Sequence, residues 1–367
     1  MAVKRSMTDH TTLAFGRVTI DGRTCSMQEA LRVFEPRNGE DQSDWKEAIH
    51  RTLVELGDPD RHLSTTTSGT TGPPKQLPIA RVDLMNSAQL TGSAFELSPG
   101  DRTLHCLPCD FIAGKMMLVR AFALGLDMHF IDPQGGILDH LHTTDRFRFA
   151  AMVPMQLHRM LREDRERVER QFATILLGGG PVSDALIKDL EGLNTEVVHS
   201  YGSTETVTHV ALRNLNGPKH SDQFHAIGQV HFGRDPRGCL VVYTPHLIMG
   251  QHVTNDLVEL VDDTHFRWSG RYDNVILSGG KKIFPEQLEA RTTDLLPYPH
   301  YFTSAHDDVL GQAVVIVVET DLPEQEMMPD IMQRLSPVLH PHEWPRRIRT
   351  LPRIERTSAG KMIRAAR

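Results

Sequence analysis

The chain has 367 residues, enough for about two to three domains and for a core that needs no disulfides. Its composition, 39% hydrophobic and 24% charged, is typical of a globular protein and argues against wholesale disorder. A formal net charge of −7 argues against a general nucleic-acid binder. No apolar stretch has the ~18 residues of a membrane span, no secretory signal is visible and the 4 cysteines are scattered, so we expect a cytoplasmic protein.

Helical and extended patterns alternate from residue 45 to residue 199. Apolar residues at helical spacing predict helices over residues 45–56, 84–95 and 115–124, and another that begins near Ser183. Extended apolar runs predict strands over residues 103–107, 128–131, 173–177 and 196–199. Such alternation predicts a mainly parallel sheet with helices on its faces.

The pattern changes after about residue 237. Short strands over residues 239–243, 257–261 and 266–268 predict an antiparallel β subdomain. Beyond Gly270 we expect an α+β module with helices near 285–295 and 326–335, strands at 301–304 and 313–319, and a basic tail. The sequence therefore predicts an α/β protein with a large domain over residues 1–270 and a small α+β domain over residues 271–367, which the resemblance described below implies to be mobile.

A loop of glycine and hydroxyl residues runs from Ser64 to Lys75. Small residues let the backbone approach a polyanion, hydroxyls and N–H groups donate to phosphate oxygens, and the terminal lysine adds a charge. These features predict a nucleotide-phosphate loop, although a flexible polar loop would have a similar composition. The loop differs from the P-loop NTPase signature, because Pro73 and Pro74 would prevent a helix from beginning there.

This loop resembles the T-S-G-T-T-G-x-P-K signature of the AMP-forming acyl-CoA synthetase and adenylating-enzyme superfamily. Further segments resemble superfamily motifs in the same order, namely Tyr201–Glu205, Thr254–Asp256, Ser269–Asp273 with Ser278–Ile283, and Arg356–Lys361. Asn255 departs from the glycine of the T-G-D motif, which leaves the local turn open but keeps the carboxylate. Because superfamily members usually carry a longer N-terminal region, we expect that part of the fold to be reduced here.

The resemblance implies a role for each matching residue. The phosphates of ATP would contact Thr67, Ser68, Gly69, Thr70, Thr71, Gly72 and Lys75, with Lys75 also assigned to catalysis. The nucleotide pocket would include Gly179, Gly180, Ser200, Tyr201 and Gly202, although a plain strand-to-helix turn would also explain the two glycines. Thr204 would contact the α-phosphate, Glu205 would bind Mg²⁺, Asp256 the ribose, and Arg271 the ribose or phosphates. Lys361 would be the mobile catalytic lysine, Asp273 the hinge, and Gly279 and Gly280 part of the thiol tunnel.

The implied activity is the ATP- and Mg²⁺-dependent conversion of a carboxylic acid into an acyl-adenylate and then a coenzyme A thioester. Residues 112–117 and 204–213 resemble the short o-succinylbenzoate-CoA ligases of menaquinone synthesis. That substrate keeps a second carboxylate, which needs a cation or several donors if it is buried. By position, Lys115, His209 and Arg213 are the candidates for this role, and Phe111 would line the acyl pocket.

Other functions stay open at this point. Within the superfamily the alternatives are an aryl- or fatty-acid ligase, or one that loads a carrier protein in place of coenzyme A. A non-catalytic adenylate-binding protein is a different class, against which the joint presence of Lys75, Glu205, Asp256, Arg271 and Lys361 argues. A phosphoryl transferase is a more distant alternative that would release ADP. We expect small-molecule substrates and no nucleic acid, and leave a homodimer open.

Overall fold

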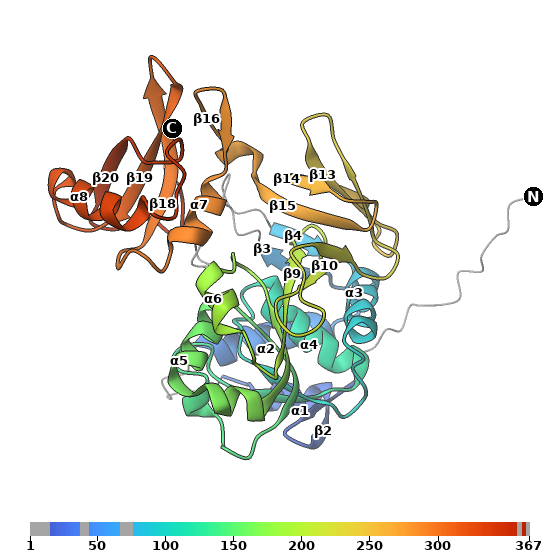
Figure 1. The fold of residues 1–367 in the computed structure, drawn as a ribbon. Helices are drawn as coiled ribbons and strands as arrows, with labels where there is room; N and C mark the ends of the chain where they lie inside the picture. Colours follow the sequence, from blue (N-terminus) through green and yellow to red (C-terminus); the bar gives the residue numbers. More distant parts are fainter. Residues whose placement is uncertain (1–14, 37–43, 67–75, 358–361, 365–367) are drawn as a thin grey trace, which may run out of the picture.

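The structure is a computed structural model that describes residues 15–36, 44–66, 76–357 and 362–364. Its strands form one 13-stranded sheet, a second sheet of five strands and a two-stranded hairpin. Helices flank the large sheet, which confirms the predicted α/β class (Figure 1). Within the described ranges, no helix combines the length and the apolar character needed to cross a bilayer.

One half of the large sheet is parallel, as predicted. Its strands are adjacent in the order β9-β8-β7-β5-β6-β1, and β2 closes the edge antiparallel to β1. Their bounds are β1 Arg17–Ile20, β2 Arg23–Ser26, β5 Arg102–His105, β6 Asp127–Phe130, β7 Phe147–Met152, β8 Phe172–Leu177 and β9 Glu196–Gly202. The predicted strands within this half are confirmed to within a few residues.

Helices cover both faces of the parallel half because its strands bury side chains on both sides. On β7, Phe149 and Ala151 face a core shared with α2, α3 and α4, whereas Ala150 and Met152 face a second core shared with α5 and α6. This alternation is the period of two that a strand imposes. The helices are α1 Met27–Val33, α2 Asp44–Gly57, α3 Arg81–Ala94, α4 Ile112–Leu124, α5 Pro154–Gln171 and α6 Asp184–Asp189, with a 3₁₀ turn at Leu138–His140.

The other half of the large sheet is antiparallel. The strands predicted after residue 237 are confirmed, but they continue the same sheet through β10, in the order β12-β13-β14-β15-β11-β10. Their bounds are β10 His209–Asn214, β11 Phe224–Ala226, β12 His231–Arg234, β13 Cys239–Thr244, β14 Gly250–Leu260 and β15 His265–Arg271. A separate hairpin pairs β3, Leu63–Thr66, with β4, Gln76–Ile79.

The C-terminal part has its own sheet and core. Its strands are β16 Ile276–Ser278, β17 Lys281–Ile283, β18 His300–Asp307, β19 Gly311–Glu319 and β20 Arg347–Leu351, with helices α7 Pro285–Thr292 and α8 Glu324–Leu335. A 3₁₀ turn, η2, at Tyr272–Asn274 connects β15 to β16, and α7 lies nearest the large sheet, in contact with β15 (Figure 1). The domain boundary placed between residues 270 and 271 stays a prediction.

Helix α5 and strand β7 are absent from the predicted elements. The helix is strongly charged, and its buried residues are only Leu157, Met160, Val168 and Gln171. Its backbone also departs from helical geometry at Asp164, which has φ −159°. Leu157, Met160, Leu161 and Val168 do lie at helical spacing, so the missed signal was this short apolar pattern among many charged residues.

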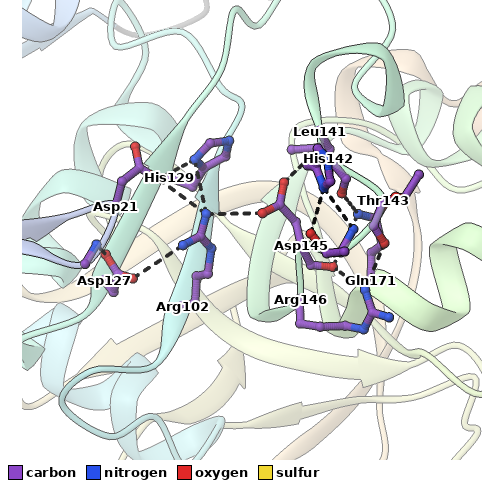
Figure 2. A network of polar contacts seen from close by, with 12 residues as sticks. Asp21, Arg102, Asp127, His129, Leu141, His142, Thr143, Asp145, Arg146 and Gln171 are labelled. Carbon is purple, nitrogen blue, oxygen red and sulfur yellow. Dashed lines mark hydrogen bonds and ion pairs between the residues drawn. The ribbon is translucent and has the colours of Figure 1, made fainter.

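A charged network ties the N-terminal hairpin to the amino ends of the parallel strands. Arg102, at the start of β5, lies 3.3 Å from Asp21, 3.8 Å from Asp127 and 3.3 Å from Asp145. His129 Nδ1 lies 2.5 Å from the same Asp21 carboxylate (Figure 2). Because ligands of open α/β sheets bind at the carboxyl ends of the strands, this network stabilises the edge opposite the expected site.

We expect the stability contributed by His105 to fall with acidification. This side chain at the end of β5 is buried, and burial lowers its pKa to about 4 from 6.5. Between these two values only the unfolded chain binds the proton, so acid favours unfolding by up to about 2 kcal/mol between pH 6.5 and 5. Denaturant unfolding should therefore show the stability difference between wild type and His105→Gln shrinking from pH 7 to pH 5. The same comparison with His220→Gln, at an exposed position, should not change, and equal behaviour of both variants would contradict this account.

Candidate functional site

Two predicted segments meet at the carboxyl edge of the parallel half. The loop that begins at Gly178 follows β8, and the segment from Ser200 to Glu205 closes β9. The Gly178 N–H donates to the Met152 carbonyl at 3.1 Å, and Ser200 Oγ donates to the Leu177 carbonyl at 2.8 Å. These bonds hold both segments where open α/β sheets bind ligands.

Backbone geometry requires glycine at two of the predicted positions. Gly179 has φ +78°, which side chains rarely adopt. Gly202 has ordinary dihedrals, but a Cβ there would collide with the Thr208 carbonyl on the facing strand. Both residues therefore have a conformational reason that is independent of ligand binding.

The turn that carries Thr204 and Glu205 is internally braced and strained. Thr206 Oγ1 accepts from the Ser203 N–H at 2.9 Å and contacts the Thr208 carbonyl at 2.8 Å. Val207, a β-branched residue, has φ +65°, a conformation that costs about 1–3 kcal/mol and gathers at functional sites. The sequence motif did not reveal Thr206, whose hydroxyl shapes the turn without reaching solvent.

Asp256 is oriented by two other predicted residues. Tyr201 Oη donates to Asp256 Oδ2 at 2.6 Å, and Arg271 Nη1 lies 3.7 Å from Asp256 Oδ1. Burial, and next the Asp256 carboxylate, raise the pKa of Tyr201, so the phenol keeps its proton as a donor. The structure therefore brings Tyr201, Asp256 and Arg271 together from three different strands.

Asn255, which stands where the T-G-D motif has glycine, contacts the predicted hinge residue Asp273. Asn255 Nδ2 donates to Asp273 Oδ2 at 3.1 Å, and its Oδ1 accepts from Arg237 Nη1 at 2.9 Å. Arg271 Nη2 lies 3.6 Å from the same Asp273 carboxylate, and Arg237 stacks over the Tyr272 ring. The Asn255 side chain, which a glycine at this position would lack, thus joins β14 to the turn between the two sheets.

Arg213 contacts a histidine beside the glycine loop. Its Nη2 donates to His199 Nδ1 at 3.2 Å, and its guanidinium lies 5.1 Å from the Phe224 ring centre. Burial, and next Arg213, lower the pKa of His199 to about 3, while a bond to the Gly180 backbone opposes this. Neutral His199 therefore links Arg213 to the predicted nucleotide loop, a role that the sequence did not reveal.

Lys115 lies in a different environment from His209 and Arg213. Its Nζ donates to the Ser64 carbonyl at 2.5 Å and lies 3.6 Å from Glu55, which accepts from the Ser64 N–H at 3.1 Å. These groups line a polar cavity of about 210 Å³ below the β3–β4 hairpin. Phe111 is half-buried at the residue before α4 begins.

Arg120, on α4, lies near His209 and was not among the site residues predicted from the sequence. It is 3% exposed, and its Nε and Nη2 donate to the hydroxyls of Thr91 and Thr208, each at 3.1 Å. Among the described residues no carboxylate lies within ion-pair distance, and burial lowers its pKa to about 10. The signal in the sequence was an arginine in the middle of the apolar run that follows Lys115 in α4.

His209 shares both hydroxyl partners of Arg120. Its Nε2 lies 3.2 Å from Thr91 Oγ1, and its Nδ1 lies 2.9 Å from Thr208 Oγ1. Burial, and next Arg120, lower its pKa, so the imidazole is neutral. A buried cation without a carboxylate, beside a neutral imidazole and two hydroxyls, forms a set of groups suited to an anion.

Several predicted residues lie outside the described ranges: Thr67, Ser68, Gly69, Thr70, Thr71, Gly72, Lys75 and Lys361. The structure describes the residues on either side of them. Strands β3 and β4 flank residues 67–75, and an isolated bridge pairs Arg356 with Met362 around residues 358–361. Gly279 and Gly280 form the turn between β16 and β17, where the Gly279 N–H donates to the Leu310 carbonyl at 2.9 Å.

The chemistry of the turn fits Mg²⁺ and a nucleotide. Glu205 is exposed and has no ion-pair partner in the described part of the chain, and the buried Ser203 Oγ has no hydrogen-bond partner there. An exposed carboxylate and hydroxyls are the hard oxygen donors that Mg²⁺ binds, with phosphate oxygens supplying further ligands. No group of three or more His, Cys, Asp or Glu side chains in the described ranges could hold a metal by itself.

Comparisons with known proteins define the class. The family model for the AMP-binding enzyme matches residues 18–237, and the chain belongs to this family. A solved structure from Dyadobacter fermentans, an acyl-CoA synthetase (AMP-forming)/AMP-acid ligase II-like protein, is 34% identical. The match covers 92% of this chain and 96% of that one, with a TM-score of 0.59.

Curated relatives are similar over a smaller share of their length. The 2-succinylbenzoate–CoA ligase of Haemophilus influenzae is 28% identical over 61% of this chain and 52% of its own. That of Bacillus subtilis is 24% identical over 81% and 66%. The chain thus spans about half to two thirds of these relatives. A structure of the Bacillus subtilis o-succinylbenzoate coenzyme A synthetase with ATP and magnesium, 20% identical, shares the fold over 93% of this chain and 81% of that one at a TM-score of 0.68.

We expect Tyr201→Phe to weaken nucleotide binding more than turnover. The variant removes the hydrogen bond that orients Asp256, which should cost about 1 kcal/mol or more and raise the KM for ATP about fivefold or more. Tyr243→Phe, on β13 with its ring stacked on His231, is the matched control. Steady-state kinetics with ATP varied would contradict this role if Tyr201→Phe lowered kcat alone or left both constants unchanged.

Proposed function

We propose that the chain is an ATP-dependent, AMP-forming acid–coenzyme A ligase. The observation that carries this proposal is the Asp256 carboxylate held by Tyr201 and Arg271 beside the braced turn of Thr204 and Glu205. Membership of the AMP-binding enzyme family supports the same function. The small sheet beyond Arg271 is proposed as the second part that such an enzyme needs.

In the first step a carboxylate oxygen of the acid attacks the α-phosphorus of ATP, and the bond to pyrophosphate breaks. Two anions react, so cations and donors must be placed where charge develops. Lys361 would bridge the carboxylate and the α-phosphate, Thr204 would donate to the α-phosphate, and the loop ending at Lys75 would hold the remaining phosphates. Mg²⁺ bound at Glu205 would neutralise phosphate charge.

In the second step the thiolate of coenzyme A attacks the acyl carbon, and AMP leaves. Lys361 must make room for the thiol, so we propose a rotation of the small domain about Asp273 that brings Gly279 and Gly280 to the thiol path. The contacts of Asn255 and Arg271 with Asp273 support this pivot, because Arg271 also lies close to Asp256, the proposed ribose ligand. Closure of the site is therefore coupled to the residues that bind ribose.

For the acid we propose o-succinylbenzoate, the substrate in the names of the curated relatives. After activation of its succinyl carboxylate, the ring carboxylate must still be stabilised. Arg120 and His209 suit this task, because Arg120 is a buried cation without a carboxylate among the described residues. Lys115 and Arg213 stay predictions for this role, but their contacts with Glu55 and His199 favour positioning roles.

The alternatives differ in their products and acceptors. An aryl- or fatty-acid ligase would form AMP and pyrophosphate with a monocarboxylate, and a carrier-protein ligase would do so without using coenzyme A. A non-catalytic binding protein would release no pyrophosphate with any acid. Pyrophosphate release measured with o-succinylbenzoate, benzoates and fatty acids, with and without coenzyme A, therefore separates these functions.

We expect Lys361→Ala to abolish adenylate formation but to spare thioester formation from a supplied acyl-adenylate. The lysine stabilises charge only in the first step, so the two half-reactions should respond differently. Lys188→Ala, on α6, controls for the loss of a lysine elsewhere. Pyrophosphate release and thioester formation are measured separately, and an equal loss of both would refute this role.

We expect Arg120→Gln to change substrate preference. Loss of the buried cation should lower kcat/KM about ten- to 150-fold for o-succinylbenzoate, or about 1.5–3 kcal/mol, and little for a monocarboxylate of similar shape. Arg167→Gln is the control, because Arg167 also bonds neutral acceptors, Gln171 and Leu141, away from the site. A uniform loss with both acids would show that Arg120 serves folding or nucleotide binding instead.

A further inference from the structure

A nearly buried charged cluster lies on α7, outside the site described above. Arg364 Nη2 lies 2.6 Å from Glu289 Oε2 and 2.7 Å from its Oε1, and 3.9 Å from Glu286 Oε1. The side chains of Arg364 and Glu289 are 24% and 14% exposed. Separating such a nearly buried ion pair leaves both charges poorly solvated, which costs free energy. The pair therefore holds α7 and the C-terminal segment together.

The cluster joins three parts of the small domain. Glu289 Oε1 accepts from the Phe302 N–H at 2.9 Å, which fixes α7 against β18. Glu286 Oε1 accepts from Asn274 Nδ2, in the η2 turn that follows Asp273. Arg364 brings in the C-terminal segment and lies over the Tyr301 ring. The hinge turn, α7 and the end of the chain therefore share one set of contacts.

The C-terminal segment held by this cluster flanks the predicted catalytic lysine. Arg364 follows Lys361 by three residues, and the Ile363 N–H donates to the Glu355 carbonyl at 2.8 Å. On the other side, Arg356 Nη2 lies 3.4 Å from Glu319 on β19. Glu289 thus supplies a side-chain anchor on one side of Lys361, and Glu319 supplies one on the other.

We propose that Glu289 and Arg364 are positioning residues that fix the segment bearing Lys361 to α7 beside the hinge. The inference rests on the proposed function and adds residues that act through the lysine without touching substrate. If the anchor is lost, Lys361 reaches the reacting groups less often, and only the step that uses Lys361 slows.

The anchor can be removed without leaving a bare buried charge. Burial raises the pKa of Glu289 to about 7, with Arg364 opposing this shift and Glu286 adding to it. When Arg364 is replaced, the Glu289 carboxyl can therefore take up a proton near neutral pH. Arg364→Gln and Glu289→Gln are suitable variants, and Arg364→Lys keeps the charge while losing the planar guanidinium.

A second ion pair on the same helix provides the matched control. Arg291 Nη2 lies 2.8 Å from Glu343 Oε1, and the two side chains are 27% and 13% exposed. This pair ties α7 to the segment before β20 and does not involve the C-terminal residues. Glu343→Gln therefore reports the cost of losing a comparable ion pair without loss of the anchor.

The test measures both half-reactions of each full-length variant, together with hydrogen exchange over residues 355–364. We expect Glu289→Gln and Arg364→Gln to slow pyrophosphate release about tenfold or more, to change thioester formation from supplied adenylate less than about twofold, and to speed exchange. Arg364→Lys should restore part of the first step, and Glu343→Gln should not separate the two steps.

Two results in the Glu289 and Arg364 variants would overturn the inference while wild type stays active. One is an equal effect on both half-reactions, and the other is unchanged adenylate formation with unchanged exchange. The same split in Glu343→Gln would also overturn it, because a general loss of stability would then explain the effect. Wild type that releases no pyrophosphate with any acid would refute the proposed function itself, and the inference with it.

Discussion

The hydrogen bond from Tyr201 to Asp256 joins the two halves of the large sheet. Tyr201 closes the parallel half, whereas Asp256 lies on β14, separated from β9 in the sheet by β10, β11 and β15. Because one continuous sheet carries both residues, the carboxyl edge of the parallel strands and the far antiparallel strands face one site. Arg271 extends this contact to the turn that leads into the small sheet. The groups proposed to bind ribose and the proposed hinge are thus parts of one connected structure.

The proposed active site has an exposed charged region and a buried charged region, which suit different parts of the substrates. The exposed Glu205 suits a metal and phosphates, whereas Arg120 and His209 are buried and suit the uncharged surroundings of an acyl group with one retained carboxylate. Lys115 already lies near the Glu55 carboxylate, and Arg213 is only half-buried and donates to His199, whereas Arg120 is buried against two hydroxyls. Which basic residue can bind a substrate and which one stabilises the fold therefore depends on its contact partners more than on its residue type.

The sequence predicted what local patterns encode. The apolar runs of β8 and the antiparallel strands, and the helical period of α2, identify elements because burial imposes a period on the chain. The motifs likewise indicated Tyr201, Asp256 and Arg271, which the structure brings together. Arg120 was missed because its contacts depend on partners far along the chain. Helix α5 was missed because its many charged residues and the break at Asp164 mask the helical spacing of its few buried residues. The Asn255 contact with Asp273 could not be foreseen either, because an asparagine in place of the motif's glycine does not show which residue its side chain will meet in the fold.

The central claim is that the acid is activated through a bond between its own carboxylate oxygen and the α-phosphorus of ATP. The most direct test supplies wild type with ¹⁸O-carboxylate-labelled o-succinylbenzoate, ATP, Mg²⁺ and coenzyme A, and measures the label in the products by mass spectrometry. The account predicts one ¹⁸O atom in AMP and none in pyrophosphate, because the thiol breaks the acyl carbon–oxygen bond. Label in inorganic phosphate together with ADP would show an acyl-phosphate route and would contradict the account.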